Sequence, residues 1–268
     1  MAARNAWVDV PVFELGITTE QVIGYLLVFA RVGAWVWLTP PFGGPFLPPQ
    51  VRVLTGLAFA IPMTPGAIAA SGGISLDPLN LLFQFAIQIA IGVALGLVCL
   101  ILLSAVQSAG AVIDVTGGFA LAQAYDPLMQ QQASVISRVY RVLAGVLILV
   151  SGGYLIILAG FSTTFEVLPI GSGLSTELTA MTLTEALSTA FLAVLQIAGP
   201  IIAILLLADI GLGLLTRVAP TINLFVLSFP VKIGLTLLLV GIAIPQISPM
   251  LAGLTDASVD AMRGIAGG

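Results

Sequence analysis

Long apolar stretches recur along the chain and are separated by shorter segments rich in proline, glycine or polar residues. A membrane-spanning helix needs about 20 mostly apolar residues. Six stretches meet this requirement, namely residues 21–39, 51–70, 79–105, 139–161, 186–215 and 227–250. The pattern therefore predicts an all-α integral membrane protein with about six hydrophobic helices.

Prolines mark the expected bends. Pro62 and Pro65 interrupt the second stretch, which predicts either a kink or a helix over only half of it. Pro200 follows a glycine in the fifth stretch and predicts a second kink. Residues 39–49 hold five prolines in eleven positions, which excludes a regular helix between the first two stretches.

Two similar passages predict related helical hairpins, one near each end of the chain. In each, an arginine is followed by an apolar, proline-containing connector and by a helix that opens with a cation. The first passage runs from Arg31 to Arg52 and the second from Arg217 to Lys232. We therefore expect the helices to be arranged as hairpins.

Composition excludes several classes of protein. Charged residues make up 7% of the 268 positions, against roughly 25% in a soluble domain, and the mean hydropathy is +1.16. The net charge of −4, with no basic run, argues against a nucleic-acid partner. Histidine is absent and Cys99 is the single cysteine, so the commonest general base and the commonest metal ligands are missing. An enzyme, a cofactor and a bound metal are therefore not predicted.

Four charged residues fall within or close to apolar stretches: Arg31, Asp114, Asp209 and Lys232. A charge in hydrocarbon costs several kcal/mol unless it is paired or reaches water. One interpretation is an ion or proton path through Asp209. The other is a structural pair of Asp209 with Lys232 or Arg31 that locks helices or subunits together. The second is favoured because a proton path needs a further relay residue; a membrane enzyme that uses Asp209 is a remote third interpretation.

The connector at residues 217–230 is short and strongly apolar. A hydrophobic loop in water is costly, so this segment should contact another protein or the membrane interface. That favours a subunit of a larger complex over the alternative, a stand-alone secondary transporter or channel. The expected partner-contacting residues are Arg217, Pro220, Asn223, Phe225, Phe229 and Pro230.

The connector at residues 104–138 is the longest and predicts a pore element or an ordinary exposed loop, with equal weight. Its middle is small and apolar from Gly117 and Gly118 onward and stops at Asp126-Pro127. Non-helical backbone at membrane depth is tolerated only where it lines a cavity or packs in protein.

The chain resembles the FliR family of bacterial flagellar export proteins and its injectisome counterparts along nearly its whole length. The resemblance is carried by the order and spacing of several short segments. These are Arg31-Val32, Thr39–Gly44, Val51–Leu57, Gly118-Phe119, Tyr125–Pro127, Ser137-Arg138, Phe165–Gly171, Arg217–Asn223 and Phe229–Lys232.

The resemblance implies a core subunit of the type III export gate in the bacterial inner membrane, in a flagellar or injectisome basal body. Its implied partners are FliP-like and FliQ-like subunits, an FlhB-like protein, exported unfolded proteins and membrane lipid. It also implies an N-terminal segment over 1–20, a FliP-like portion over 21–185, a FliQ-like hairpin over 186–250 and a tail over 251–268.

The same resemblance implies a plug loop over Thr116–Pro127. Relatives often carry two phenylalanines in this loop, where this chain has Leu121 and Ala124. Phe119 and Tyr125 are then candidates to replace the missing bulk. The full set of expected pore and plug residues is Gly117, Gly118, Phe119, Leu121, Ala124, Tyr125, Asp126 and Pro127.

Overall fold

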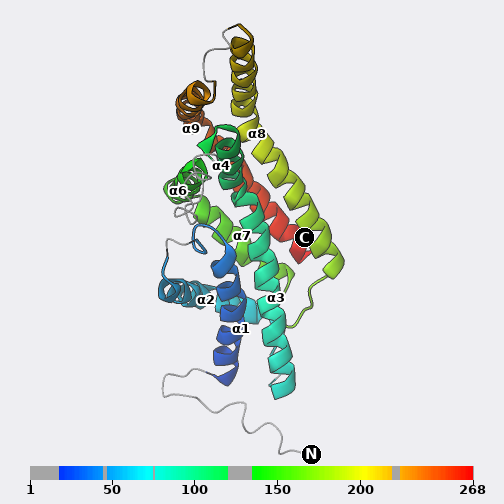
Figure 1. Ribbon diagram of the computed structural model, residues 1–268. Helices are drawn as coiled ribbons and strands as arrows, with labels where there is room; N and C mark the ends of the chain where they lie inside the picture. The colour runs from blue at the N-terminus through cyan, green and yellow to red at the C-terminus, as the bar shows by residue number, and fades with distance from the viewer. Residues whose placement is uncertain (1–17, 45–46, 75, 120–134, 219–223, 268) are drawn as a thin grey trace, which may run out of the picture. The chain divides into compact units, whose positions relative to one another are not determined.

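The computed structural model describes residues 18–44, 47–74, 76–119, 135–218 and 224–267 (Figure 1). All the regular elements in these ranges are helices, which confirms the all-α prediction. Five of the helices are long and apolar enough to cross a membrane, and a bent pair forms a sixth span if it is counted as one. The prediction of an integral membrane protein with about six hydrophobic helices is thus confirmed.

The chain divides into two units, and the first comprises residues 1–100, 154–186 and 255–268. Its first helix, α1 (Thr19–Leu38), is capped by Thr18, whose hydroxyl accepts the Gln21 N–H while the Gln21 side chain accepts the Thr18 N–H. This reciprocal cap satisfies two amides that the helix leaves unpaired. The helix ends where the prolines of the first connector begin, as predicted.

The second helix, α2 (Pro49–Ser71), packs against α1 and begins with proline at its first position. It continues through Pro62 and Pro65, so the second of the two alternatives, a helix over only half of this stretch, was wrong. In a membrane protein, contacts with neighbouring helices compensate for the loss of the hydrogen bonds that such prolines remove. The helix ends at Gly72, whose φ of 66° is readily adopted only by glycine.

The third helix, α3 (Pro78–Leu103), makes backbone contact with α1 through two glycines four residues apart. A Cβ at Gly92 would collide with the Arg31 carbonyl, and a Cβ at Gly96 would lie 3.2 Å from the Trp35 carbonyl. Small residues at this spacing let two membrane helices approach closely. Trp35 is fully buried and stacks on Phe161 of α7 (Gly153–Val167), with ring centroids 4.3 Å apart.

The second unit comprises residues 101–153 and 187–254. It contains α4 (Ala105–Thr116) and α6 (Val135–Val150), which pack against each other. The expectation of a connector over 104–138 was therefore wrong for α4 and for the first turn of α6. The helix α4 forms because Val106, Ala109 and Ile113 recur at helical spacing, and all three are buried.

The fourth predicted span, residues 139–161, was wrong as a single helix. The helix α6 ends at Val150 and α7 begins at Gly153, separated by Ser151 and Gly152. Gly152 has a φ of 75°, which a right-handed helix cannot contain. The stretch is therefore two helices.

The last two helices, α8 (Thr176–Val218) and α9 (Leu224–Ala266), have 43 residues each and extend well beyond the predicted spans 186–215 and 227–250. Both continue through internal prolines, and Pro200 lies inside α8. The predicted tail over 251–268 is helical as far as Ala266. The apolar connector expected over 217–230 is correspondingly shorter, because α9 already begins at Leu224. Residues 219–223 lie outside the described residues.

Candidate functional site

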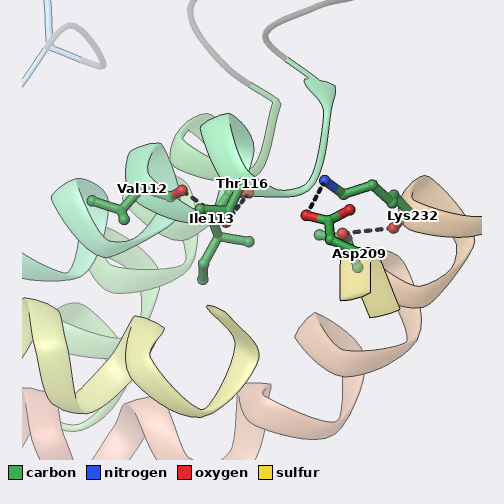
Figure 2. Close-up of polar contacts among 6 residues, drawn as sticks. Val112, Ile113, Thr116, Asp209 and Lys232 are labelled. Carbon is green, nitrogen blue, oxygen red and sulfur yellow. Dashed lines mark hydrogen bonds and ion pairs between the residues drawn. The ribbon is translucent and has the colours of Figure 1, made fainter. Parts of the chain in front are cut away.

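The C-terminal end of α4 is where the expected plug segment begins. Gly117 N–H donates to the Ile113 carbonyl at 2.7 Å. Thr116 Oγ1 donates to the Val112 and Ile113 carbonyls at 3.1 and 3.2 Å (Figure 2). These bonds satisfy carbonyls that a helix end otherwise leaves unpaired. Gly118 then takes a φ of 88°, which turns the chain out of the helix.

Of the expected plug residues, Gly117, Gly118 and Phe119 are described. The others lie outside the described residues, and their roles stay predictions: Leu121, Ala124, Tyr125, Asp126 and Pro127.

Gly117 lies directly against α9. A Cβ at this position would be 2.6 Å from Thr236 Oγ1 and 3.0 Å from Thr236 Cγ2. Thr236 is fully buried, and its hydroxyl donates to the Lys232 carbonyl at 2.7 Å. The first glycine of the pair is therefore required for space, in contrast to Gly118, which is required for its backbone conformation.

Asp114 joins α4 to the beginning of α6. Its Oδ1 accepts the Ile136 N–H at 3.0 Å and its Oδ2 accepts the Ser137 N–H at 2.9 Å, and the residue is fully buried. The sequence identified Asp114 as a charged residue within or close to an apolar stretch. It did not indicate this contact, because the partners are 22 and 23 residues away along the chain.

Asp209 of α8 and Lys232 of α9 form an ion pair, with Lys232 Nζ 2.9 Å from Asp209 Oδ2 (Figure 2). The Asp209 side chain is 46% exposed and the Lys232 side chain 19%. Of the two cations considered for Asp209, Lys232 is thus the one in contact. The pair links two helices within the second unit.

Arg31 has neutral partners instead of a carboxylate. Its Nε donates to Gln88 Oε1 at 2.7 Å, and its Nη2 donates to the Leu168 carbonyl at 2.9 Å. The guanidinium carbon also lies 4.3 Å from the centroid of the Phe165 ring, and the residue is fully buried. The proposed pairing of Arg31 with Asp209 is replaced by these contacts within the first unit.

The expected partner-contacting residues fall mostly at helix ends. Arg217 is exposed in the last turn of α8, and Phe229 and Pro230 lie within α9 rather than in a loop. Phe225 also belongs to α9, whereas Pro220 and Asn223 lie outside the described residues. In the described ranges, no group of three His, Cys, Asp or Glu side chains is placed to hold a metal ion.

Comparison with known proteins decides the family. Residues 22–258 match the profile of the family described as bacterial export proteins, family 1. The chain belongs to this family. Bacterial export proteins of family 1 that resemble it include the flagellar biosynthetic protein FliR of Escherichia coli K12, which is 30% identical over 239 residues. That match covers 88% of this chain and 91% of the relative.

Further relatives come from both flagellar and secretion systems. The FliR protein of Bacillus subtilis is 26% identical over 245 residues, covering 90% of this chain and 93% of the relative. The Yop proteins translocation protein T of Yersinia pestis is 27% identical over 175 residues, covering 65% of this chain and 67% of the relative. The resemblance to the FliR family is thereby confirmed. Together with its apolar helices, membership makes this chain a multi-pass inner membrane protein of a flagellar or injectisome basal body.

Proposed function

We propose that this chain is a core subunit of a type III protein export gate. In this proposal it assembles with FliP-like and FliQ-like subunits and an FlhB-like protein. Together they form the pore through which unfolded substrates cross the inner membrane. Membership in the export family and the near-full coverage of FliR relatives support it.

The observation that carries the proposal is the length of the exposed apolar surface on α8. Large apolar side chains are exposed from Leu187 to Leu215, a distance of about 42 Å at 1.5 Å per residue. The hydrocarbon core of a bilayer is about 30 Å thick. A helix would need a tilt of about 45° to cover this length with lipid, beyond the usual range of up to about 40°. Part of this surface is therefore expected to be covered by neighbouring proteins.

The exposed carboxylate on the same helix supports the same conclusion. Asp209 is 46% exposed and lies between the exposed side chains of Leu207 and Ile210. A half-exposed ion pair in hydrocarbon costs several kcal/mol, so lipid is a poor neighbour for this face. A partner subunit can cover the apolar side chains and still offer a polar group or water to the carboxylate.

In the proposed mechanism, the segment Thr116–Pro127 plugs the resting pore. A hydrophobic constriction excludes ions because water is unstable in it. Gly117 and Gly118 form the point from which the segment swings aside when substrate arrives. The substrate needs no covalent chemistry at this step, which agrees with a family of export-apparatus membrane proteins rather than enzymes.

Purification of the affinity-tagged chain, co-expressed with its FliP-like and FliQ-like neighbours, tests the assembly. We expect one large particle that contains all three proteins, with this chain in fewer copies than a symmetric ring requires. A monomer or a symmetric homo-oligomer that moves a small solute without companions would instead support a stand-alone transporter.

Shortening the proposed plug tests the gate. Deletion of residues 121–124 should raise the leak of ions across the inner membrane while the particle still assembles. The matched control removes residues 171–173 from the connector between α7 and α8 and should leave the membrane tight. An assembled particle with the shortened plug and an unchanged leak would contradict the plug assignment.

A further inference from the structure

The helices α2 and α7 of the first unit leave an open groove between them. Its volume of about 440 Å³ lies within the range of pockets that accommodate a ligand. Ala67 of α2 and Phe165 of α7 line the groove and are buried, whereas Pro62, Gly66 and Glu166 line it and are exposed. The groove can therefore be reached from outside the first unit.

Gly66 shows that the groove has room for side chains from another molecule. A Cβ at Gly66 would meet no atom of the described residues within 4 Å. This glycine has no positive φ, so its backbone conformation does not require glycine. Ala159 of α7 also lines the groove. Small residues let a further membrane helix approach closely, so the shape of the groove suits a helix.

The polar groups at the groove are acceptors. Glu166 is the last but one residue of α7, where the helix dipole is negative and disfavours a carboxylate. Ser162 Oγ donates its hydrogen to the Ala159 carbonyl at 2.7 Å, so its lone pairs remain for an occupant. Pro62 has no N–H group to donate to the Ala58 carbonyl one turn earlier. An occupant that brings a cation would complement all of these groups.

Arg31 does not pair with this carboxylate. It binds the Leu168 carbonyl just beyond the same end of α7, and its guanidinium lies over the Phe165 ring. Arg31 is fully buried, however, whereas Glu166 is exposed and forms no ion pair within the described part of the chain. At membrane depth a carboxylate is unfavourable unless it is paired or reaches water, so lipid tails are poor occupants of this groove.

We propose that the groove between α2 and α7 is the docking site for an apolar helix of another subunit, and that this helix carries a lysine or arginine that pairs with Glu166. Apolar side chains of the partner fill the space over Gly66. This inference rests on the proposed function, because the partner is a second protein of the same particle.

Photo-crosslinking within the purified, co-expressed complex tests the occupant. Met63 lines the groove and is half-buried, so a photoreactive amino acid in its place would face the partner. We expect a crosslink to another subunit, which mass spectrometry should place within two helical turns of a lysine or arginine on an apolar helix. A crosslink to a second copy of this chain, to a segment without a cation, or to lipid alone would overturn the inference.

Two substitutions test the shape and the charge of the groove. Gly66→Leu should lower the crosslink yield at least about tenfold because it fills the groove, whereas Gly66→Ala should lower it less than about twofold. Glu166→Lys should lower the yield at least about tenfold, because it brings like charges together. Glu185→Lys is the matched control: Glu185 is exposed on α8 outside the groove lining, and we expect an unchanged yield.

A charge exchange separates a lost contact from a damaged fold. Replacing the partner's crosslinked cation by glutamate should restore the crosslink, and any lost particle, in the Glu166→Lys complex. A failure to restore either would overturn the pairing. A particle that holds all the proposed subunits but ignores both Gly66→Leu and Glu166→Lys would overturn the docking site and leave the proposed function in place. A wild-type chain that purifies as a monomer would overturn both.

Discussion

The two adjacent glycines at the end of α4 allow one prediction that separates two reasons for requiring glycine. Gly117 has a φ of −73°, which any residue adopts, but a Cβ there would lie 2.6 Å from Thr236 Oγ1. Gly118 has a φ of 88°, and a Cβ there would meet no atom of the described residues within 4 Å. We therefore expect both substitutions to lower the stability of the folded protein. Gly117→Ala does so for lack of space, and Gly118→Ala does so through backbone strain.

The expected magnitudes are similar for the two substitutions. Contacts of a Cβ are ordinary from 3.4 Å outward, so Gly117→Ala requires α4 or Thr236 to shift by several tenths of an ångström. Thr236 is buried and β-branched, and overpacking at such a site costs about 1–3 kcal/mol. A left-handed conformation costs a residue other than glycine about 1–2 kcal/mol. The single variants alone do not distinguish the two reasons.

A second substitution does distinguish them. Thr236→Ala removes both atoms that the new Cβ at position 117 would meet most closely on α9. In Gly117→Ala/Thr236→Ala we expect at least about 1 kcal/mol of favourable coupling, whereas Gly118→Ala/Thr236→Ala should be additive within about 0.5 kcal/mol. The measurement is the shift in the thermal unfolding midpoint of the purified complex across both cycles. Equal rescue of the two glycine variants by Thr236→Ala, or rescue of neither, refutes the reasoning.

Three further predictions concern charges and helix packing. Asp209→Asn should lower the yield of assembled complex, and the charge exchange Asp209→Lys with Lys232→Asp should restore part of it; an equal loss in both would contradict a pairwise contact. Arg31→Lys should lower the unfolding midpoint nearly as much as Arg31→Ala, because an ammonium cannot reproduce the Nε and Nη2 bonds, each worth about 1.5–3 kcal/mol. Gly92→Ala should lower the unfolding midpoint because the new methyl group meets the backbone of α1. Gly145→Ala is the control: its methyl group would meet no atom of the described residues within 4 Å, so a thermal scan should show an unchanged or higher midpoint.

The helical type and the approximate number of membrane spans could be predicted because hydropathy alone decides them, whereas the number and lengths of the individual helices could not. Residues 176–185 are rich in threonine and lie outside the predicted spans, but they belong to α8. In a helix a threonine hydroxyl can donate to the carbonyl four residues earlier, so polarity does not exclude helix. Three threonines of this segment do so: Thr179, Thr182 and Thr184.

Some of what was missed is nevertheless readable from spacing. Leu251, Leu254, Met262 and Ile265 are buried and recur at helical intervals within the predicted tail. In contrast, no local pattern could have revealed the contact between Asp114 and Ser137, because it spans 23 residues and the expected plug segment lies between them. Contacts of this kind depend on the packing of α4 against α6.

The two fully buried charges in the described ranges act on opposite ends of helices, and this explains how each is tolerated without an opposite charge. Asp114 binds amides at the beginning of α6, where the helix dipole is positive. Arg31 binds the Leu168 carbonyl just beyond the end of α7, where the dipole is negative. The arrangement therefore favours a structural role for both charges over a proton path, which agrees with the proposed function.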